Sequence, residues 1–195
     1  MFSAIICTYI NDQPHLLELA LSSIHNQELL PSEVILVQDG PISAEASIII
    51  SRFKTDLERK KIGFKLHVLP ENVGHGSARR VGIDSALHDV IAICDADDIN
   101  LPHRFSTQYE YLHENLKISA VGAHIQECTN GKPVAIKLVP SAPEDIRKYC
   151  RFRCPINQMT VMFKRKDIMA VGGYQDFYHY EDYFLRSVLR RFVRS

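Results

Sequence analysis

Short apolar runs alternate along the chain with segments whose apolar residues recur at helical spacing. The apolar runs predict strands of a largely buried sheet at residues 2–8, 34–37, 64–69, 90–94 and 118–123. The stripes between them predict helices, one from Leu16, Leu19, Ala20, Ser23 and Ile24, one over residues 48–57, and one from Ala78, Val81, Gly82, Ser85 and Ala86. This alternation predicts a single-domain α/β fold with a parallel sheet and right-handed crossovers.

The fourth apolar run stops abruptly in a cluster of three carboxylates, Asp95, Asp97 and Asp98. Like charges at a strand end repel one another, so the cluster is best explained by a solvent-filled cleft that holds a divalent cation. Asp95 and Asp97 supply the hard oxygen ligands that Mg²⁺ and Mn²⁺ prefer, and Mg²⁺ usually adds substrate phosphates to one or two carboxylates. The cluster therefore implies a phosphorylated substrate, with a solvated acidic loop or a helix start as the alternative.

Two other strand ends are also polar. Thr8 and Tyr9 follow the first run and could line a base pocket, while Asp39 follows the second and could accept hydrogen bonds from a nucleobase or ribose. Each end has a structural alternative, because Asn11 and Asp12 make a good helix cap and Asp39-Gly40-Pro41 makes a serviceable turn. Ligands bind at the carboxyl ends of parallel strands, so three coincident polar ends favour a binding site.

A glycine loop follows the third strand and leads into a helix. Gly74 and Gly76 permit close backbone approach, the helix start presents unpaired N–H groups, and Arg79 could contact phosphate oxygens. These features suit a diphosphate, although a tight loop before a small-residue helix also packs well for structural reasons alone. His75 and His179 could contact diphosphate or metal, or could be ordinary surface histidines.

Composition limits the classes of partner. The 195 residues include 23 basic and 23 acidic side chains, so no basic surplus favours nucleic acid or an anionic membrane. No stretch approaches the ~20 apolar residues of a spanning helix, and the five cysteines lack paired C-x-x-C spacing. We expect a cytoplasmic protein, with the basic, apolar tail at residues 189–195 as a possible contact with the inner face of a membrane that carries a lipid-linked acceptor.

Together the motifs resemble the family-2 glycosyltransferases of the GT-A fold, most closely bacterial enzymes of surface-polysaccharide biosynthesis. The resemblance runs in order from residue 2 to about 185. The motifs that carry it are Cys7-Thr8-Tyr9, Val37-Gln38-Asp39-Gly40, Asn72-x-Gly74, Ala78-Arg79-Arg80-x-Gly82, Asp95-Ala96-Asp97-Asp98, Gly172-Gly173-Tyr174 and Glu181-Asp182. The chain departs from the family pattern at Gln38, where many members carry Asp, and at Arg80, where Asn is usual.

The resemblance implies a mixed, mainly parallel sheet and inverting transfer from a nucleotide-sugar donor, a UDP-sugar, to the hydroxyl of a saccharide or lipid-linked saccharide. It implies that Asp95 and Asp97 hold Mg²⁺ or Mn²⁺. The residues that it places against the donor are Thr8, Tyr9, Asp39, Gly74, Arg79 and Asp95. Asp182 falls on the catalytic base that accepts the acceptor's proton, with an acidic helix start as its alternative.

The resemblance also divides the chain into a nucleotide-binding half, residues 1–98, and an acceptor-side half, residues 99–195, that is shorter than is usual in the family. A non-catalytic nucleotide-sugar-binding remnant is one alternative function. A nucleotidyltransferase is another, but it would normally carry a basic, glycine-rich loop after the first strand. Residues 9–12 of this chain contain neither glycine nor lysine.

Overall fold

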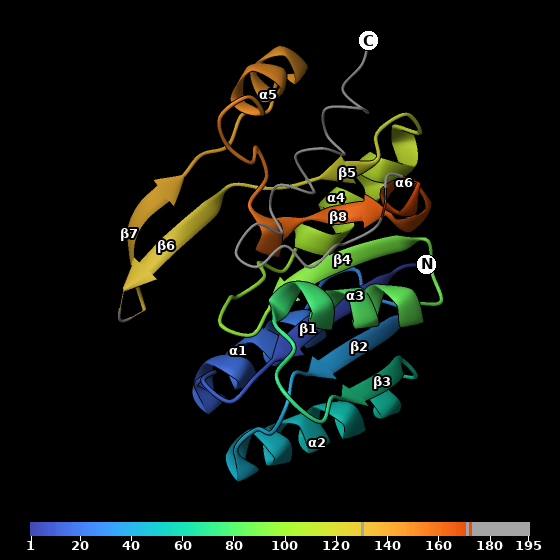
Figure 1. The fold of residues 1–195 in the computed structure, drawn as a ribbon, viewed down its shortest axis with the longest axis vertical. Helices are drawn as coiled ribbons and strands as arrows, with labels where there is room; N and C mark the ends of the chain where they lie inside the picture. The colour runs from blue at the N-terminus through green and yellow to red at the C-terminus, as the bar shows by residue number, and fades with distance from the viewer. Residues whose placement is uncertain (130, 171, 173–195) are drawn as a thin grey trace.

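The structure, a computed structural model, describes residues 1–129, 131–170 and 172. Its centre is a six-stranded sheet, and a separate two-stranded sheet projects from it (Figure 1). The strands of the large sheet, in spatial order, are β3 (Gly63–Val68), β2 (Glu33–Gln38), β1 (Ser3–Thr8), β4 (Val90–Asp95), β8 (Met162–Lys164) and β5 (Ala120–Val121). The first four run parallel and β8 runs antiparallel to both of its neighbours, so the sheet is mixed and mainly parallel.

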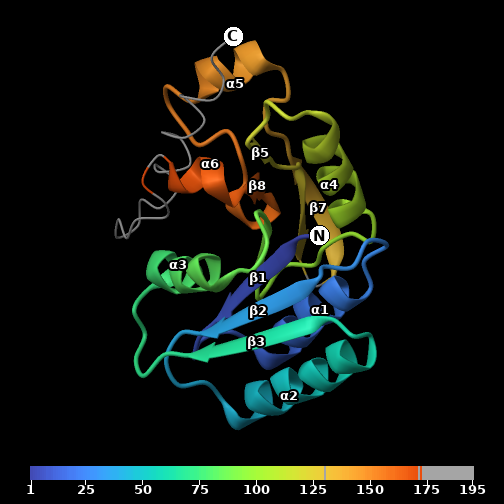
Figure 2. The ribbon, with the colours of Figure 1, turned by 90° about the vertical axis from the view of Figure 1, so that its right-hand side faces the viewer.

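Helices cover both faces of the large sheet (Figure 2). Side chains alternate across a strand, so Ala4 and Ile6 enter one core while Ile5 and Cys7 enter the other. The first core contains residues of α1 (Pro14–His25), α2 (Ala44–Arg59) and α4 (Arg104–Glu114). The second contains residues of α3 (His75–Ser85) and α6 (Arg165–Met169). The remaining helical segments are α5 (Pro143–Tyr149) and the 3₁₀ turn η1 (Gln158–Thr160).

The strand register brings the predicted polar ends to one edge of the sheet. Thr8 lies opposite Gln38, and Cys7 lies opposite Asp95. The chain order reverses between β1 and β4, since β2 and β3 extend from β1 on one side while β4 lies on the other. A crevice at such a switch point is where open α/β sheets bind their ligands.

Gly82 explains how closely α3 packs on this sheet. A Cβ atom at Gly82 would lie 2.7 Å from Ile5 Cγ2 and 3.3 Å from Val37 Cγ2. Only a residue without a side chain lets the helix approach β1 and β2 to this distance. The predicted small-residue stripe is therefore confirmed as a packing surface. It sets the distance between α3 and strands β1 and β2.

Several elements differ from the sequence expectation. The fifth predicted strand, residues 118–123, shortens to β5, and the alternation did not predict β8 or the hairpin of β6 (Ile125–Thr129) and β7 (Lys132–Lys137). β3 is an edge strand whose Leu66 and Val68 are exposed, which corrects the expectation of burial. In α1 the buried face contains Leu17 and Leu21 rather than Leu16 and Leu19, while Ala20, Ser23 and Ile24 are buried as predicted.

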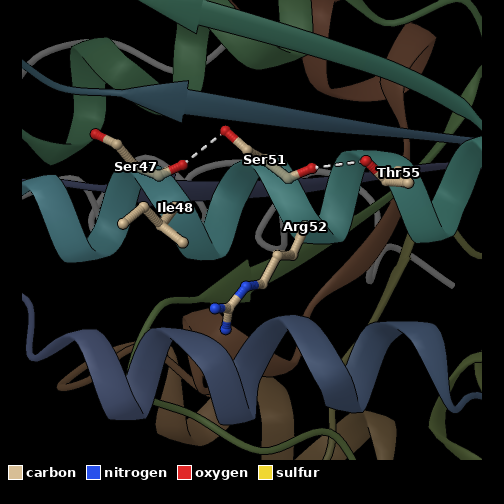
Figure 3. A pocket seen from close by; sticks show the side chains of 5 residues that line it. All are labelled: Ser47, Ile48, Ser51, Arg52 and Thr55. Carbon is tan, nitrogen blue, oxygen red and sulfur yellow. Dashed lines mark hydrogen bonds between the residues drawn. The ribbon is translucent and has the colours of Figure 1, made fainter.

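Within the described part of the chain, no helix is long and apolar enough to cross a membrane. A shallow, open depression of about 370 Å³ lies along the exposed side of α2 (Figure 3). Its lining residues are Ser47, Ile48, Ser51, Arg52 and Thr55, none of which belongs to a predicted motif. The chemistry expected from the sequence therefore lies elsewhere, at the carboxyl edge of the strands.

Candidate functional site at the carboxyl edge of the sheet

The end of β1 contributes a buried hydroxyl and an exposed ring. Thr8 is 1% exposed and Tyr9 is 40% exposed, so the chain emerges from the sheet between them. Thr8 Oγ1 forms no hydrogen bond of normal geometry, although it lies close enough to Asp12 to affect that carboxyl group. Asp12 caps the turn by accepting the Tyr9 N–H at 3.0 Å. The helix-cap role predicted for Asn11 and Asp12 is wrong, because the N-cap of α1 is Gln13, whose side chain makes no capping hydrogen bond. Asp12 instead closes the turn after β1, and the Tyr9 ring remains open to a ligand.

Asp39 ties the end of β2 to the glycine loop. Its Oδ1 accepts the Val73 N–H at 2.7 Å and its Oδ2 accepts the Gly74 N–H at 3.2 Å. Gly74 has a φ of +90°, a left-handed conformation that favours glycine. The carboxylate therefore orders the loop that precedes α3, and its contact with a nucleoside stays a prediction.

Gln38 stands where many family members carry Asp. Its Nε2 donates a hydrogen bond of 2.9 Å to the Gly40 carbonyl oxygen. A carboxylate cannot donate this bond, so the amide is suited to holding the turn after β2. A Cβ atom at Gly40 would lie 2.8 Å from Asn72 N, so the turn also packs tightly against the glycine loop.

Arg79 lies beneath the glycine loop rather than at its surface. Its side chain is 2% exposed, and Nη2 donates to Asp95 Oδ1 at 2.5 Å. His75 Nε2 lies 3.8 Å from the same oxygen. Charge-assisted hydrogen bonds of this kind hold a carboxylate in a fixed orientation. The structure thus brings the glycine loop and the acidic cluster together through Arg79, whose contact with phosphate remains a prediction.

The acidic cluster concentrates negative charge at the end of β4. Burial, together with the neighbouring Asp95 and Asp97 carboxylates, raises the pKa of Asp98 to about 6. Burial also raises the pKa of Asp12, and the charge of Asp97 adds to that effect. Asp97 itself is exposed. Four carboxyl groups therefore approach one another here, and a cation would relieve their repulsion.

The described residues contain no group of three or more His, Cys, Asp or Glu side chains arranged to hold a metal ion by themselves. A site made of Asp95 and Asp97 still fits Mg²⁺ or Mn²⁺ if phosphate oxygens complete the coordination. The observation that supports this fit is the placement of three carboxylates, Asp95, Asp97 and Asp98, within four residues at the end of β4, with Asp97 exposed to solvent. The donor set is therefore suited to a metal that arrives with a diphosphate.

Arg104 follows the acidic cluster in the sequence, where it could approach the site or lie on a solvated helix surface, and the structure buries it at the start of α4. Its Nη2 donates to the Ile93 carbonyl oxygen at 2.8 Å, and its Nε donates to Gln108 Oε1 at 3.1 Å. A further bond joins Nη1 to Asn100 Oδ1. Burial lowers the pKa of Arg104, while the neighbouring Cys94 side chain and the carboxylates of Asp95 and Asp98 act in the opposite sense. Arg104 therefore holds the end of β4 and the loop after it in place, through Ile93 and Asn100.

Helical periodicity could have revealed this role. The buried residues of α4 are Arg104, Phe105, Gln108 and Leu112, which share one face of the helix. An arginine and a glutamine on an apolar face indicate a satisfied polar network. The loop after α1 supplies a second support, because Gln27 Nε2 donates to the Leu101 carbonyl oxygen at 2.8 Å and Gln27 Oε1 accepts the Phe105 N–H at 3.0 Å. The loop after the acidic cluster is thus held on two sides.

Cys7 and Cys94 are buried next to the site without taking part in it. Burial raises the pKa of the Cys7 thiol to about 12, and burial likewise raises the pKa of Cys94. Thiols in this state are neither nucleophiles nor metal ligands at neutral pH. Cys94 lies in the first core and Cys7 in the second, so both are packing residues.

Other predicted features lie outside the described residues. They are His179, the Gly173-Tyr174 part of its motif, the Glu181-Asp182 pair and the tail at residues 189–195. The role of Asp182 as the base therefore stays a prediction.

The chain matches the sequence profile of Glycosyl transferase family 2 over residues 3–172. It is 36% identical over 186 residues to an Escherichia coli protein named UDP-Gal:alpha-D-GlcNAc-diphosphoundecaprenol beta-1,3-galactosyltransferase, covering 94% of this chain and 66% of that one. It is 33% identical over 185 residues to the amylovoran biosynthesis glycosyltransferase AmsE of Erwinia amylovora, covering 95% of this chain and 68% of that one. The chain thus spans about two-thirds of the length of these relatives.

Solved structures share the fold at lower identity. The structure of Staphylococcus aureus TarS 1–349 in complex with UDP-GlcNAc superposes with a TM-score of 0.73 and 20% identity, covering 97% of this chain and 53% of that one. The mannosyltransferase PcManGT of Pyrobaculum calidifontis, in complex with GDP-Man and Mn²⁺, superposes with a TM-score of 0.63 and 18% identity, covering 88% of this chain and 46% of that one.

Proposed function

Because the chain belongs to glycosyl transferase family 2, we propose that it transfers a sugar from a nucleotide-diphosphate sugar to a hydroxyl acceptor in bacterial polysaccharide biosynthesis. Its fold is the GT-A fold. The observation that carries the proposal is the meeting of Thr8, Asp39 and the Asp95–Asp98 cluster at the switch point between β1 and β4. Open α/β sheets bind nucleotides at such a point.

The donor that we propose is a UDP-sugar. The E. coli relative is named for UDP-Gal, and the TarS structures were solved with UDP and with UDP-GlcNAc. In this chain the exposed Tyr9 ring offers a surface on which a base can stack, and Asp39 orders the loop that leads into α3. A diphosphate placed against this helix start would lie next to the acidic cluster.

Asp95 and Asp97 are the residues that would hold Mg²⁺ or Mn²⁺. Asp95 would supply one carboxylate from the end of β4, and exposed Asp97 would supply the second. When bound, the metal stabilises the negative charge that develops on the departing diphosphate. Arg79 acts here as a positioning residue for Asp95, and Arg104 holds the end of β4 in place.

The displacement that we propose inverts the anomeric carbon. The acceptor hydroxyl attacks C1 of the sugar, the bond from C1 to the diphosphate breaks, and Asp182 takes the hydroxyl proton. We propose a saccharide or a lipid-linked saccharide as the acceptor, since the E. coli relative is named for a sugar on diphosphoundecaprenol. Location on the cytoplasmic side of the membrane stays a prediction.

The test is binding of UDP by the full chain, measured by thermal shift and calorimetry with Mn²⁺ or with EDTA. We expect UDP to raise Tm with Mn²⁺ and to have little effect with EDTA, because a ligand at a hundredfold excess over its Kd stabilises the native state by ~2.7 kcal/mol. Asp97→Asn should weaken the metal-dependent binding by about tenfold or more. Asp84→Asn is the matched control, since Asp84 lies on α3, is half exposed and forms an exposed ion pair with Arg80 at 3.6 Å.

Equal shifts with Mn²⁺ and with EDTA would refute the metal role. A normal Mn²⁺ titration of the Asp97→Asn variant would remove Asp97 from the site. Binding of UDP without transfer to any acceptor would favour the non-catalytic remnant over the enzyme.

A further inference from the structure

Residues 157–160 lie beside the end of β4, on the side away from β1. The antiparallel pairing of β4 with β8 extends beyond the ladder to Ile93, whose N–H donates to the Val161 carbonyl oxygen at 2.9 Å. The turn η1 directly precedes Val161 and contacts β4. On the other side of β4, Cys7 of β1 lies opposite Asp95. The end of β4 therefore lies between the end of β1 and η1.

Hydrogen bonds fix the backbone of this turn. Gln108 Nε2 on α4 donates to the Thr160 carbonyl oxygen at 2.8 Å, and Thr160 Oγ1 accepts the Ala123 N–H at 2.9 Å. Asn157 Nδ2 donates to the Ala123 carbonyl oxygen at 3.0 Å. The side chains of Asn157 and Thr160 thus serve the fold, and they hold the intervening residue Gln158 in place beside β4.

The amide of Gln158 differs from these neighbours. Its Nε2 atom is buried and has no hydrogen-bond partner among the residues that the structure describes. A buried N–H donor without an acceptor destabilises a fold, and such groups are rare unless water or a ligand satisfies them. Thr8 Oγ1, at the end of β1, is in the same state in a residue that is 1% exposed. Unsatisfied polar atoms therefore flank the end of β4.

The order of the strands indicates which part of a ligand would reach Gln158. The proposed function puts the nucleoside at Thr8, Tyr9 and Asp39, at the ends of β1 and β2, and the diphosphate at the end of β4. The next strand of the sheet in the same direction is β8, which η1 precedes. In a nucleotide-diphosphate sugar, the sugar is attached to the phosphate farther from the nucleoside. The sugar would therefore follow the diphosphate toward η1.

Sugar hydroxyl groups suit an amide donor of this kind. A hydroxyl oxygen has two lone pairs that accept an N–H, whereas an ionised carboxylate only accepts. The side chains of the acidic cluster, Asp95, Asp97 and Asp98, are carboxyl groups. Gln158 therefore supplies a neutral N–H donor next to a cluster whose ionised side chains supply acceptors.

From these observations we propose that Gln158 binds the sugar of the donor, with Nε2 donating a hydrogen bond to a sugar hydroxyl oxygen. The proposal rests on the proposed function, because it names a contact that the same site makes with the transferred group. No motif in the sequence singles out Gln158, since an isolated glutamine in a segment without periodicity gives no signal.

The test is calorimetry of the full chain with UDP, UDP-galactose, UDP-glucose and UDP-GlcNAc, each with Mn²⁺. Gln158→Met keeps the length of the side chain and removes the donor. We expect this variant to bind UDP as the parent does. It should lose about tenfold in affinity for the UDP-sugar that the parent binds most tightly, which is the loss expected of one hydrogen bond. Its Tm without ligand should equal or exceed that of the parent, because an apolar group replaces an unsatisfied buried donor.

Gln126→Met is the matched control, since Gln126 is an exposed amide on β6. It should leave the Kd values for UDP and for the UDP-sugar unchanged. Equal affinity of the parent and of Gln158→Met for the UDP-sugar would overturn the proposal and assign the amide to water. An equal loss for UDP and for the UDP-sugar would also overturn it, because the amide would then contact the diphosphate or support the fold. A lowered Tm identifies the second of these cases.

The same titrations distinguish this proposal from the proposed function. A parent protein that binds no UDP refutes the proposed function. A parent protein that binds UDP, together with a Gln158→Met variant that keeps the parent's affinity for the UDP-sugar, refutes the sugar contact alone.

Discussion

Arg79 and Asp95 form a shielded ion pair between α3 and β4, with Nη2 2.5 Å from Oδ1 and side chains that are 2% and 15% exposed. The two residues come from the glycine loop's helix and from the acidic strand end, which the sequence suggested as separate halves of a diphosphate site. Their contact joins these halves before any ligand binds. Because the Asp95 carboxylate is already held in one orientation, ligand binding does not have to include the entropic cost of ordering this side chain.

The first prediction concerns this pair. Arg79→Gln should lower the free energy of unfolding by about 3 kcal/mol, because it leaves the Asp95 carboxylate partly buried without its cation. Urea denaturation measures the loss. Arg80→Gln on the same helix is the control, and its exposed pair with Asp84 should contribute less than about 1 kcal/mol. Equal losses of unfolding free energy in the two variants would show that the buried ion pair stabilises the protein no more than the exposed one.

The second prediction concerns the loop held by Asp39. Asp39→Asn replaces one acceptor oxygen with an NH₂ group, so either the Val73 or the Gly74 N–H loses its partner. We expect a loss of ~1–3 kcal/mol in stability and faster hydrogen exchange at these two amides. Asp84→Asn should leave both amides protected. Unchanged exchange in the Asp39 variant would mean that the loop is ordered by its packing alone.

Much of this arrangement could be predicted from the sequence. Four apolar runs gave the parallel strands, and the polar residues that end three of them do meet at one edge, because parallel strands point their carboxyl ends the same way. The direction in which Arg79 points could not be predicted. An arginine near a helix start suits a bound phosphate as well as a neighbouring carboxylate, and only the packing of α3 on β1 decides between them.

The missed elements have physical reasons of their own. α1 has leucines at 16, 17, 19 and 21, so more than one apolar stripe fits its sequence, and packing against α2 selects the stripe with Leu17 and Leu21. β8 has three residues, too few to show a period. The hairpin was missed because an alternating pattern normally predicts one buried face, and both of its strands are largely exposed.

The third prediction concerns pH. Burial raises the pKa of Glu33, but hydrogen bonds from Ser3 and the Leu87 N–H, together with Lys65, outweigh burial and leave this pKa below its ordinary value of 4.5. A carboxyl group with a lowered pKa in the folded state stabilises the protein fully above its ordinary pKa. That stabilisation is lost as the pH falls through the lowered value.

Glu33→Gln should therefore cost ~1–3 kcal/mol at pH 7, and the gap between parent and variant should shrink below about pH 4.5. Urea denaturation across this range measures the gap. Glu58→Gln is the control, because Glu58 is an exposed partner of Lys54 and should show little gap at any pH. A gap that grows on acidification would reverse the sign and refute the assignment.

The last prediction separates chemistry from binding at Asp182, which lies outside the described residues. Asp182→Asn should leave the affinity for UDP with Mn²⁺ nearly unchanged and lower sugar transfer by ~10²-fold or more, because the amide keeps the size of the carboxylate but cannot accept the acceptor's proton. Calorimetry measures the affinity for UDP, and release of UDP with a saccharide acceptor measures the rate of transfer.

Glu181→Gln is the matched control, since it removes the neighbouring charge, and it should retain most of the transfer rate. If the Asp182 variant transfers sugar at the parent rate, Asp182 is an acidic helix-start residue and another group accepts the proton. If Glu181→Gln is impaired as severely as Asp182→Asn, the transfer depends on the local negative charge of the pair rather than on one general base.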